Sequence, residues 1–133
     1  MVDEELSPPI SPSKLPFSVS GVTPTALEPV VYDLVNDLRQ GLNVPAKGLY
    51  FRHNGSSGTL VVSLLSSNGA QRIFDLQHSE ELGFEQGDGI QIWAVVVAGT
   101  VDSIPYTFMA IPGVWTPEEL WAVYLTQTGE AVG

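Results

Sequence analysis

The stretch TLVVSLLSSNGAQRIFDL, residues 59–76, decides the fold of this chain. It holds two apolar runs, Thr59–Leu65 and Ala70–Leu76, separated by Ser-Ser-Asn-Gly. The dipeptide Asn68-Gly69 readily takes the positive φ angles of a type I′ turn, so the stretch predicts a β-hairpin. A single hairpin is only marginally stable in water, so these apolar residues, which fall on both faces of the first run, predict further strands packed over it.

The apolar runs that follow extend this hairpin into a mainly β domain. Strands are expected at residues 49–52, 90–98 and 106–111, with turn residues and no helices between them. Such spacing favours antiparallel pairing. We therefore predict an antiparallel β-sandwich, jelly-roll-like, with an extended N-terminal arm and one or two short helices. The length of 133 residues is typical of one domain.

Residues 1–22 are predicted to be an extended Pro-rich arm, and residues 23–133 a single β-rich domain. The arm has four prolines among serines, a composition that disfavours a helix and is also typical of a disordered tail. If the arm docks on a neighbouring subunit, its apolar side chains are the expected anchors: Leu6, Ile10, Leu15, Phe17 and Val19.

A first helix is predicted near residues 28–40. Thr25 and Glu28 have capping-box spacing before it, and its apolar residues recur at helical intervals. The valines at its start, Val30 and Val31, also favour a strand.

A second helix is predicted over residues 117–126. Thr116 is placed as its N-cap, Pro117 as its first residue and Glu119 at the third position. Trp121 and Tyr124 lie on its apolar stripe, which is expected to pack on the sandwich or on a partner.

The charge balance excludes some partners. Fifteen acidic residues against five Lys and Arg give a formal net charge of −10, which repels phosphate backbones and anionic membrane surfaces. No nucleic acid or membrane partner is predicted. There is no cysteine, and no apolar run approaches the roughly 20 residues that cross a bilayer.

The sequence offers no catalytic or metal-binding pattern. His53 and His78 are the only histidines, and both fall in predicted loops without a nucleophile motif beside them, so we interpret them as surface polar residues. No acidic or histidine cluster has ligand spacing. We predict no enzyme activity, no metal and no cofactor, with a small hydrolase as the least favoured class.

The tryptophans support an alternative hypothesis, in which the chain binds a glycan. Trp93 falls in an apolar strand and is predicted to be core, whereas Trp115 and Trp121 flank the start of the second helix, where exposure would allow them to stack on a sugar. The loops at residues 53–58 and 101–103 are the other candidate contacts with a host glycan.

A family resemblance covers about half of the chain, over residues 47–111. Its segments are GLYF at 48–51, GTLVVSL at 58–64, RIFDL at 72–76, GIQIW at 89–93 and AGT at 98–100. This succession resembles small β-rich structural proteins of tailed phages, and more narrowly the spike-base proteins of phage-like particles and gene transfer agents. The resemblance implies a non-catalytic subunit and transfers no catalytic residue.

The leading hypothesis is a non-enzymatic virion structural protein of a tailed phage or phage-like particle: a head spike base, a vertex or decoration protein, or a tail or baseplate component. Its expected partners are copies of itself and other virion proteins, and its expected location is the virion. The arm anchors above and Trp115, Trp121 and Tyr124 are its predicted interface residues. The alternative is a β-sandwich module that binds a carbohydrate or host receptor.

Overall fold

Eight strands and one helix form the part of the chain that the computed structural model describes, residues 10–12, 15–36, 42–67, 70–85 and 89–128. In chain order they are β1 (Phe17–Val22), β2 (Val30–Asp33), β3 (Gly48–His53), β4 (Leu60–Leu65), β5 (Gln71–Leu76), β6 (Glu81–Phe84), β7 (Ala94–Gly99), β8 (Pro105–Ile111) and α1 (Pro117–Thr128).

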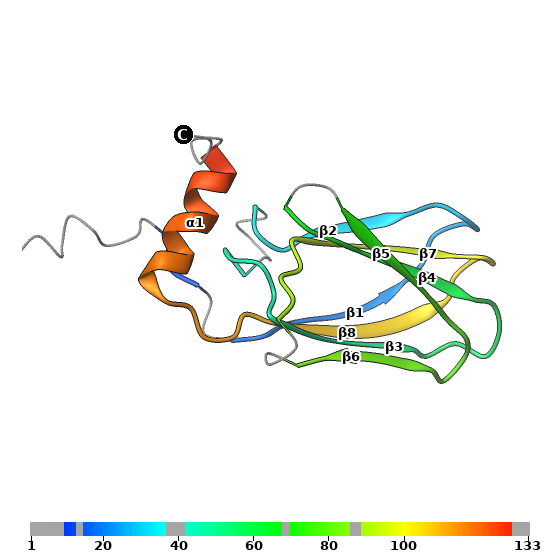
Figure 1. Cartoon of the computed structure of the whole chain (residues 1–133). Helices are drawn as coiled ribbons and strands as arrows, with labels where there is room; N and C mark the ends of the chain where they lie inside the picture. Colours follow the sequence, from blue (N-terminus) through cyan, green and yellow to red (C-terminus); the bar gives the residue numbers. More distant parts are fainter. Residues whose placement is uncertain (1–9, 13–14, 37–41, 68–69, 86–88, 129–133) are drawn as a thin grey trace, which may run out of the picture.

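The strands form two antiparallel sheets that pack face to face (Figure 1). The first sheet has the order β1-β8-β3-β6 and the second the order β2-β7-β4-β5. The pairing is nested, because β4 pairs with β5, β3 with β6, β2 with β7 and β1 with β8. Eight strands wound in this way over two sheets make a jelly roll, so the predicted fold class is confirmed.

The hairpin predicted at residues 59–76 is β4 and β5. Leu60 pairs with Leu76 and Leu65 with Gln71, in one continuous antiparallel register. The predicted turn residues Asn68 and Gly69 lie outside the described part of the chain. Within its sheet, β5 is an edge strand, and β4 is the strand of the hairpin that has neighbours on both sides.

Alternating side chains of both sheets fill the core between them. On β4, for example, Leu60, Val62 and Leu64 are buried, and the residues between them face outward and are half-buried. This period of two is what a strand with one face on the core requires. The other large buried side chains of the strands are Leu49, Phe51, Val95, Val97, Tyr106 and Phe108.

An aromatic layer ties the two sheets together. The Phe51 ring stacks between Tyr106 and Phe108 at centroid distances of 5.5 and 5.4 Å. Tyr32 reaches it from the opposite sheet, with its ring 5.0 Å from that of Phe108 and its hydroxyl 2.6 Å from the Tyr106 hydroxyl. Burial, and then this hydrogen bond, raise the pKa of Tyr106, so its neutral phenol is part of the folded core.

The helix predicted at residues 28–40 is wrong. Residues 30–33 are strand β2, which pairs with β7 from Val30 opposite Val97 to Asp33 opposite Ala94. The capping-box pair makes a turn instead, with the Thr25 hydroxyl donating to the Glu28 carboxylate at 2.8 Å. Two adjacent β-branched residues suit a strand that can pair with β7, and this tertiary pairing overrides the helical spacing. Residues 37–41 lie outside the described part.

Two further strands lie in segments where none was predicted. Strand β1 covers Phe17–Val22, so the last six residues of the predicted arm form an edge of the first sheet. The boundary after residue 22 therefore falls at the end of a strand of the sandwich. Strand β6, at Glu81–Phe84, lies where only turn residues were expected before the strand predicted at 90–98, because a strand of four residues has too short an alternating pattern to be distinguished from a loop.

Helix α1 begins where it was predicted and ends at Thr128, two residues later than expected. The Thr116 hydroxyl accepts from the Glu119 N–H at 3.2 Å, and the Glu119 carboxylate accepts from the Thr116 N–H at 3.0 Å, which confirms the capping box. The helix lies at one end of the sandwich (Figure 1), and its Leu120 and Val123 side chains are buried. Within the described residues, no helix has the length and apolar character that crossing a membrane requires.

Lys47 fastens this helix to the sandwich. Its ammonium lies 3.0 Å from the Glu119 carboxylate and 4.2 Å from the centre of the Trp115 ring. The Thr116 N–H and then Lys47 lower the pKa of Glu119 below its ordinary value of 4.5. A carboxylate that is ionised more easily in the folded state stabilises the fold above its unfolded pKa, and this contribution is lost as the pH falls through its folded pKa.

We expect Glu119→Gln to lower the free energy of unfolding by about 0.2–1 kcal/mol near neutral pH, because glutamine keeps the cap and loses the partly exposed ion pair. The loss should shrink when the pH falls below the ordinary glutamate pKa. Urea unfolding at about pH 7 and at about pH 3 measures both effects. Glu118→Gln, which removes the same charge from the same turn, is the matched control. An equal loss in both variants would assign the effect to the helix dipole.

Candidate functional site

His53 is fully buried, so its interpretation as a surface residue is wrong. Its Nδ1 accepts from the Gly55 N–H at 3.0 Å, which leaves the proton on Nε2 to be donated to the Gly58 carbonyl at 3.0 Å. Both ring nitrogens are thereby committed to the backbone of the loop at residues 54–58. His53 is a structural residue that closes this loop, and it has no free nitrogen for a substrate.

His78 is exposed, as predicted, in the turn between β5 and β6. Its Nδ1 lies 3.4 Å from the hydroxyl of the adjacent Ser79. Among the described residues, no group of three or more histidine, aspartate or glutamate side chains is placed to hold a metal ion.

The most distinctive surface is the outer face of the β2-β7-β4-β5 sheet, which is apolar. One row across it runs in register from Val31 through Val96 and Ser63 to Ile73. Val31 is 63% exposed and Ile73 is 56% exposed. We call this surface the apolar face; its other outward-facing apolar residues are Val61, Leu65, Ala94 and Ala98.

Charges are sparse on the apolar face even though the chain carries a net charge of −10. Asp33 and Asp75 are the charged residues at outward positions of its four strands. The Asp33 carboxylate is used locally, because it accepts from the N–H groups of Val35 and Asn36 at 3.1 and 2.9 Å. An exposed apolar surface of this kind is typical of an interaction site.

The outer face of the other sheet carries both polar and apolar side chains and holds a shallow groove of about 300 Å³. Tyr50 is exposed there beside Met109, and its ring lies over Gly83, which has no side chain to cover it. Arg52 lies next along the strand, with its guanidinium 3.4 Å from the Glu81 carboxylate. An exposed ring flanked by hydrogen-bonding groups is the arrangement that sugar recognition needs.

The predicted interface residues differ in how far they are buried. Ile10, Phe17, Val19 and Trp115 pack against the core of the chain itself, whereas Leu15 is 74% exposed. Trp121 and Tyr124 are half-buried on α1 and contact each other edge to face at 5.8 Å. Leu6 lies outside the described part of the chain.

The predicted glycan-binding loops are largely occupied by internal hydrogen bonds. The loop at residues 54–58 closes on His53, as described above. In the other loop, the Asp102 carboxylate accepts from the Ala26 N–H at 2.7 Å and the Ser103 N–H donates to the Pro24 carbonyl at 3.0 Å. Trp93 is half-buried just before β7. The exposed aromatic ring that sequence patterns missed is Tyr50.

No protein-family model matches the sequence, and no curated protein matches it. Among solved structures, the crystal structure of PirA is similar, with a TM-score of 0.39 and 11% sequence identity. The alignment covers 71% of this chain and 92% of the PirA chain. The candidate surfaces above therefore rest on the geometry of this chain alone.

Proposed function

We propose that this chain is a non-enzymatic structural subunit of a tailed phage or phage-like particle, and that it associates with copies of itself through the apolar face. The exposed row from Val31 to Ile73 is the observation that carries self-association. The assignment to a particle is supported by the segments quoted above, which resemble spike-base proteins, and by the jelly-roll fold, which viral capsid domains use among others.

The physical reason for association is the apolar area that water would otherwise contact. Burial of such surface contributes about 25 cal/mol per Å², and the sparse charges of the face keep the desolvation cost low. A second copy also matches this face because a twofold interface places the same patch on both sides. The net charge of −10 opposes association over longer distances, so salt should strengthen it.

The arm contributes a second contact in this proposal. Strand β1 is part of the sandwich, so we expect the residues before it to bind the neighbouring subunit. Leu15 is the predicted anchor that remains exposed in the described part, and it lies two residues before the β1 edge. A neighbouring subunit that covers Leu15 would also protect that edge from other strands.

Ile73→Lys is expected to weaken self-association by about 30-fold or more, because burying one lysine in an apolar contact costs about 2 kcal/mol or more. Val31→Lys should have a similar effect, which light scattering during gel filtration over a range of concentrations measures. Each substitution adds a positive charge and so reduces the electrostatic repulsion between two copies of the chain. This reduction would strengthen self-association, so a weaker association must come from the loss of the apolar contact.

Val22→Lys is the matched control, because Val22 is 57% exposed in the opposite sheet, at the end of β1 that lies away from Leu15. It should leave self-association unchanged. A wild-type chain that remains monomeric at high salt and high concentration would contradict the role of the apolar face.

The presence of the protein in a particle needs an experiment of its own. Particles from the organism that encodes the chain should carry the protein through density-gradient purification, as detected by mass spectrometry. Detection of the protein only in fractions without particles would rule out the virion assignment and leave the self-association result standing.

A glycan-binding module is the second candidate, and the exposed Tyr50 ring favours it. In this case the groove with Arg52 and Glu81 would bind the saccharide. A glycan array with the purified chain distinguishes the two functions, because a signal that Tyr50→Ala abolishes would assign recognition to this groove. A structural subunit should give no saccharide-dependent signal.

A further inference from the structure

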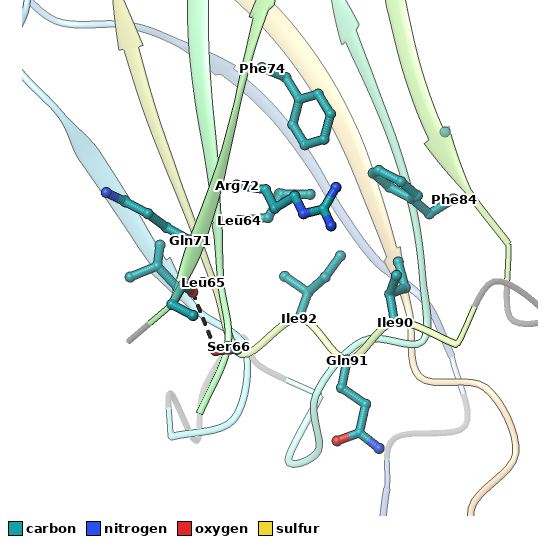
Figure 2. A pocket seen from close by; sticks show the side chains of 12 residues that line it. Leu64, Leu65, Ser66, Gln71, Arg72, Phe74, Phe84, Ile90, Gln91 and Ile92 are labelled. Atoms are coloured by element: carbon teal, nitrogen blue, oxygen red, sulfur yellow. Dashed lines mark hydrogen bonds between the residues drawn. The ribbon is translucent and has the colours of Figure 1, made fainter. Parts of the chain in front are cut away.

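A cleft of about 660 Å³ opens where the edges of the two sheets meet, between β5 and β6. At its inner end the Phe74 ring of β5 contacts the Phe84 ring of β6 edge to face, with centroids 5.7 Å apart. Ile90 and Ile92, from the segment before β7, form the opposite side (Figure 2). This volume falls within the range of about 300–1,000 Å³ that small-molecule sites occupy.

The walls are mainly apolar, and the polar residues that line them are Ser66, Gln71, Arg72 and Gln91. Leu64, Phe74 and Phe84 contribute apolar surface from three strands. Gln71 and Gln91 extend away from the cleft toward solvent in Figure 2. A ligand with an apolar body and a polar end would therefore fit the cleft in one orientation.

Arg72 supplies the charged side chain among the described residues that line the cleft. It occupies an inward position on β5, opposite Leu64 and in line with Phe74, and Figure 2 shows its guanidinium pointing into the space between the two phenylalanines and the isoleucines. Basic side chains are scarce in the described part: Lys47 pairs with Glu119 and Arg52 with Glu81. Arg72 has no hydrogen-bond or ion-pair partner there.

We propose that this cleft binds a small amphipathic carboxylate, with its alkyl or aryl group against Phe74, Phe84 and Ile90 and its carboxylate on Arg72. A guanidinium and a carboxylate form two parallel hydrogen bonds, which fixes the orientation of the ligand. A purely apolar ligand would leave this cation without a partner, and a polar sugar would leave the apolar walls without contact. The site lies between the edges of the two sheets and borders the apolar face at Leu65.

Binding of decanoate, below the concentration at which it forms micelles, tests the site. Titration calorimetry with the full-length chain should give one saturable site, and amide chemical shifts should change at residues 64–66, 70–74 and 89–92. Decanol and decylamine of the same chain length should bind at least tenfold more weakly, because neither offers an anion to Arg72.

Two variants distinguish the contribution of the Arg72 charge to binding from that of the apolar walls. Arg72→Gln should weaken decanoate binding about tenfold and decanol binding little, whereas Ile90→Ala should weaken both about threefold to tenfold. Arg52→Gln removes the same charge from the opposite side of the first sheet and is the matched control. Because Arg72 is exposed at an edge strand, its replacement should leave the fold intact, which a thermal melt verifies.

Three results would overturn the proposal. Equal binding of decanol and decanoate would show unspecific apolar adsorption. An Arg72→Gln variant that binds decanoate normally but aggregates would show that this inward charge only protects the β5 edge. Displacement of decanoate by a peptide of residues 1–9, which carries Asp3, Glu4 and Glu5 beside Leu6, would assign the cleft to the N-terminal segment.

Discussion

Phe51→Ala is expected to lower the free energy of unfolding by about 3–5 kcal/mol, a large part of the roughly 5–15 kcal/mol that stabilises a domain of this size. The Phe51 ring is buried and stacks on both Tyr106 and Phe108. Its removal leaves a cavity in the aromatic layer that both sheets share. The surrounding strands are paired on both sides, so they cannot collapse to fill it.

Denaturant unfolding followed by tryptophan fluorescence measures this loss as a lower midpoint with an unchanged slope. Tyr50→Ala is the matched control, since Tyr50 is the preceding residue of β3 and points to the outer face. It should change stability by no more than about 0.5 kcal/mol. Similar losses in the two variants would show that the aromatic layer does not hold the sheets together.

His53→Leu is expected to cost about 2–5 kcal/mol, because leucine fills a similar volume but leaves the Gly55 N–H and the Gly58 carbonyl without partners. The Gly58 backbone has a φ of 80°, and a Cβ there would lie 2.6 Å from Val101. The loop therefore has little freedom to find other partners, and its backbone amides should exchange with solvent much faster in the variant.

His78→Leu provides the control for the other histidine. His78 is exposed, and its Nδ1 lies 3.4 Å from the hydroxyl of the neighbouring Ser79, so its replacement should change the free energy of unfolding by no more than about 0.5 kcal/mol. If His53→Leu were as stable as His78→Leu, the hydrogen bonds to the loop would contribute little, and burial alone would explain the position of His53.

The sequence predicted only part of the apolar face. Apolar residues on both faces of residues 60–65 already indicated that the hairpin would be covered on two sides, and the apolar face includes Val61 and Leu65 from this run. Val31 was missed because its segment was interpreted as a helix, in which it would not align with Ile73. The alignment depends on β7 and β4, which lie between these two residues.

The cleft had no sequence signal at all. Arg72 appears in the sequence as an ordinary polar residue of an alternating strand, and its inward position follows from its register opposite Leu64. The surrounding walls come from β6 and from the segment at residues 89–92, which are distant along the chain from β4. Only the packing of one sheet on the other brings these residues together.

The sequence alone determined the features that depend on neighbours along the chain. These are the hairpin at residues 59–76, the strands beginning near 48 and 105, and the capped helix from Pro117, because side-chain period and capping act over a few residues. The tertiary structure decided the rest: β2 as a strand, β5 as an edge, the burial of His53 and the exposure of Val31 and Ile73. Each of these depends on a partner that is distant in sequence, and short apolar segments are compatible with more than one structure until that partner is present.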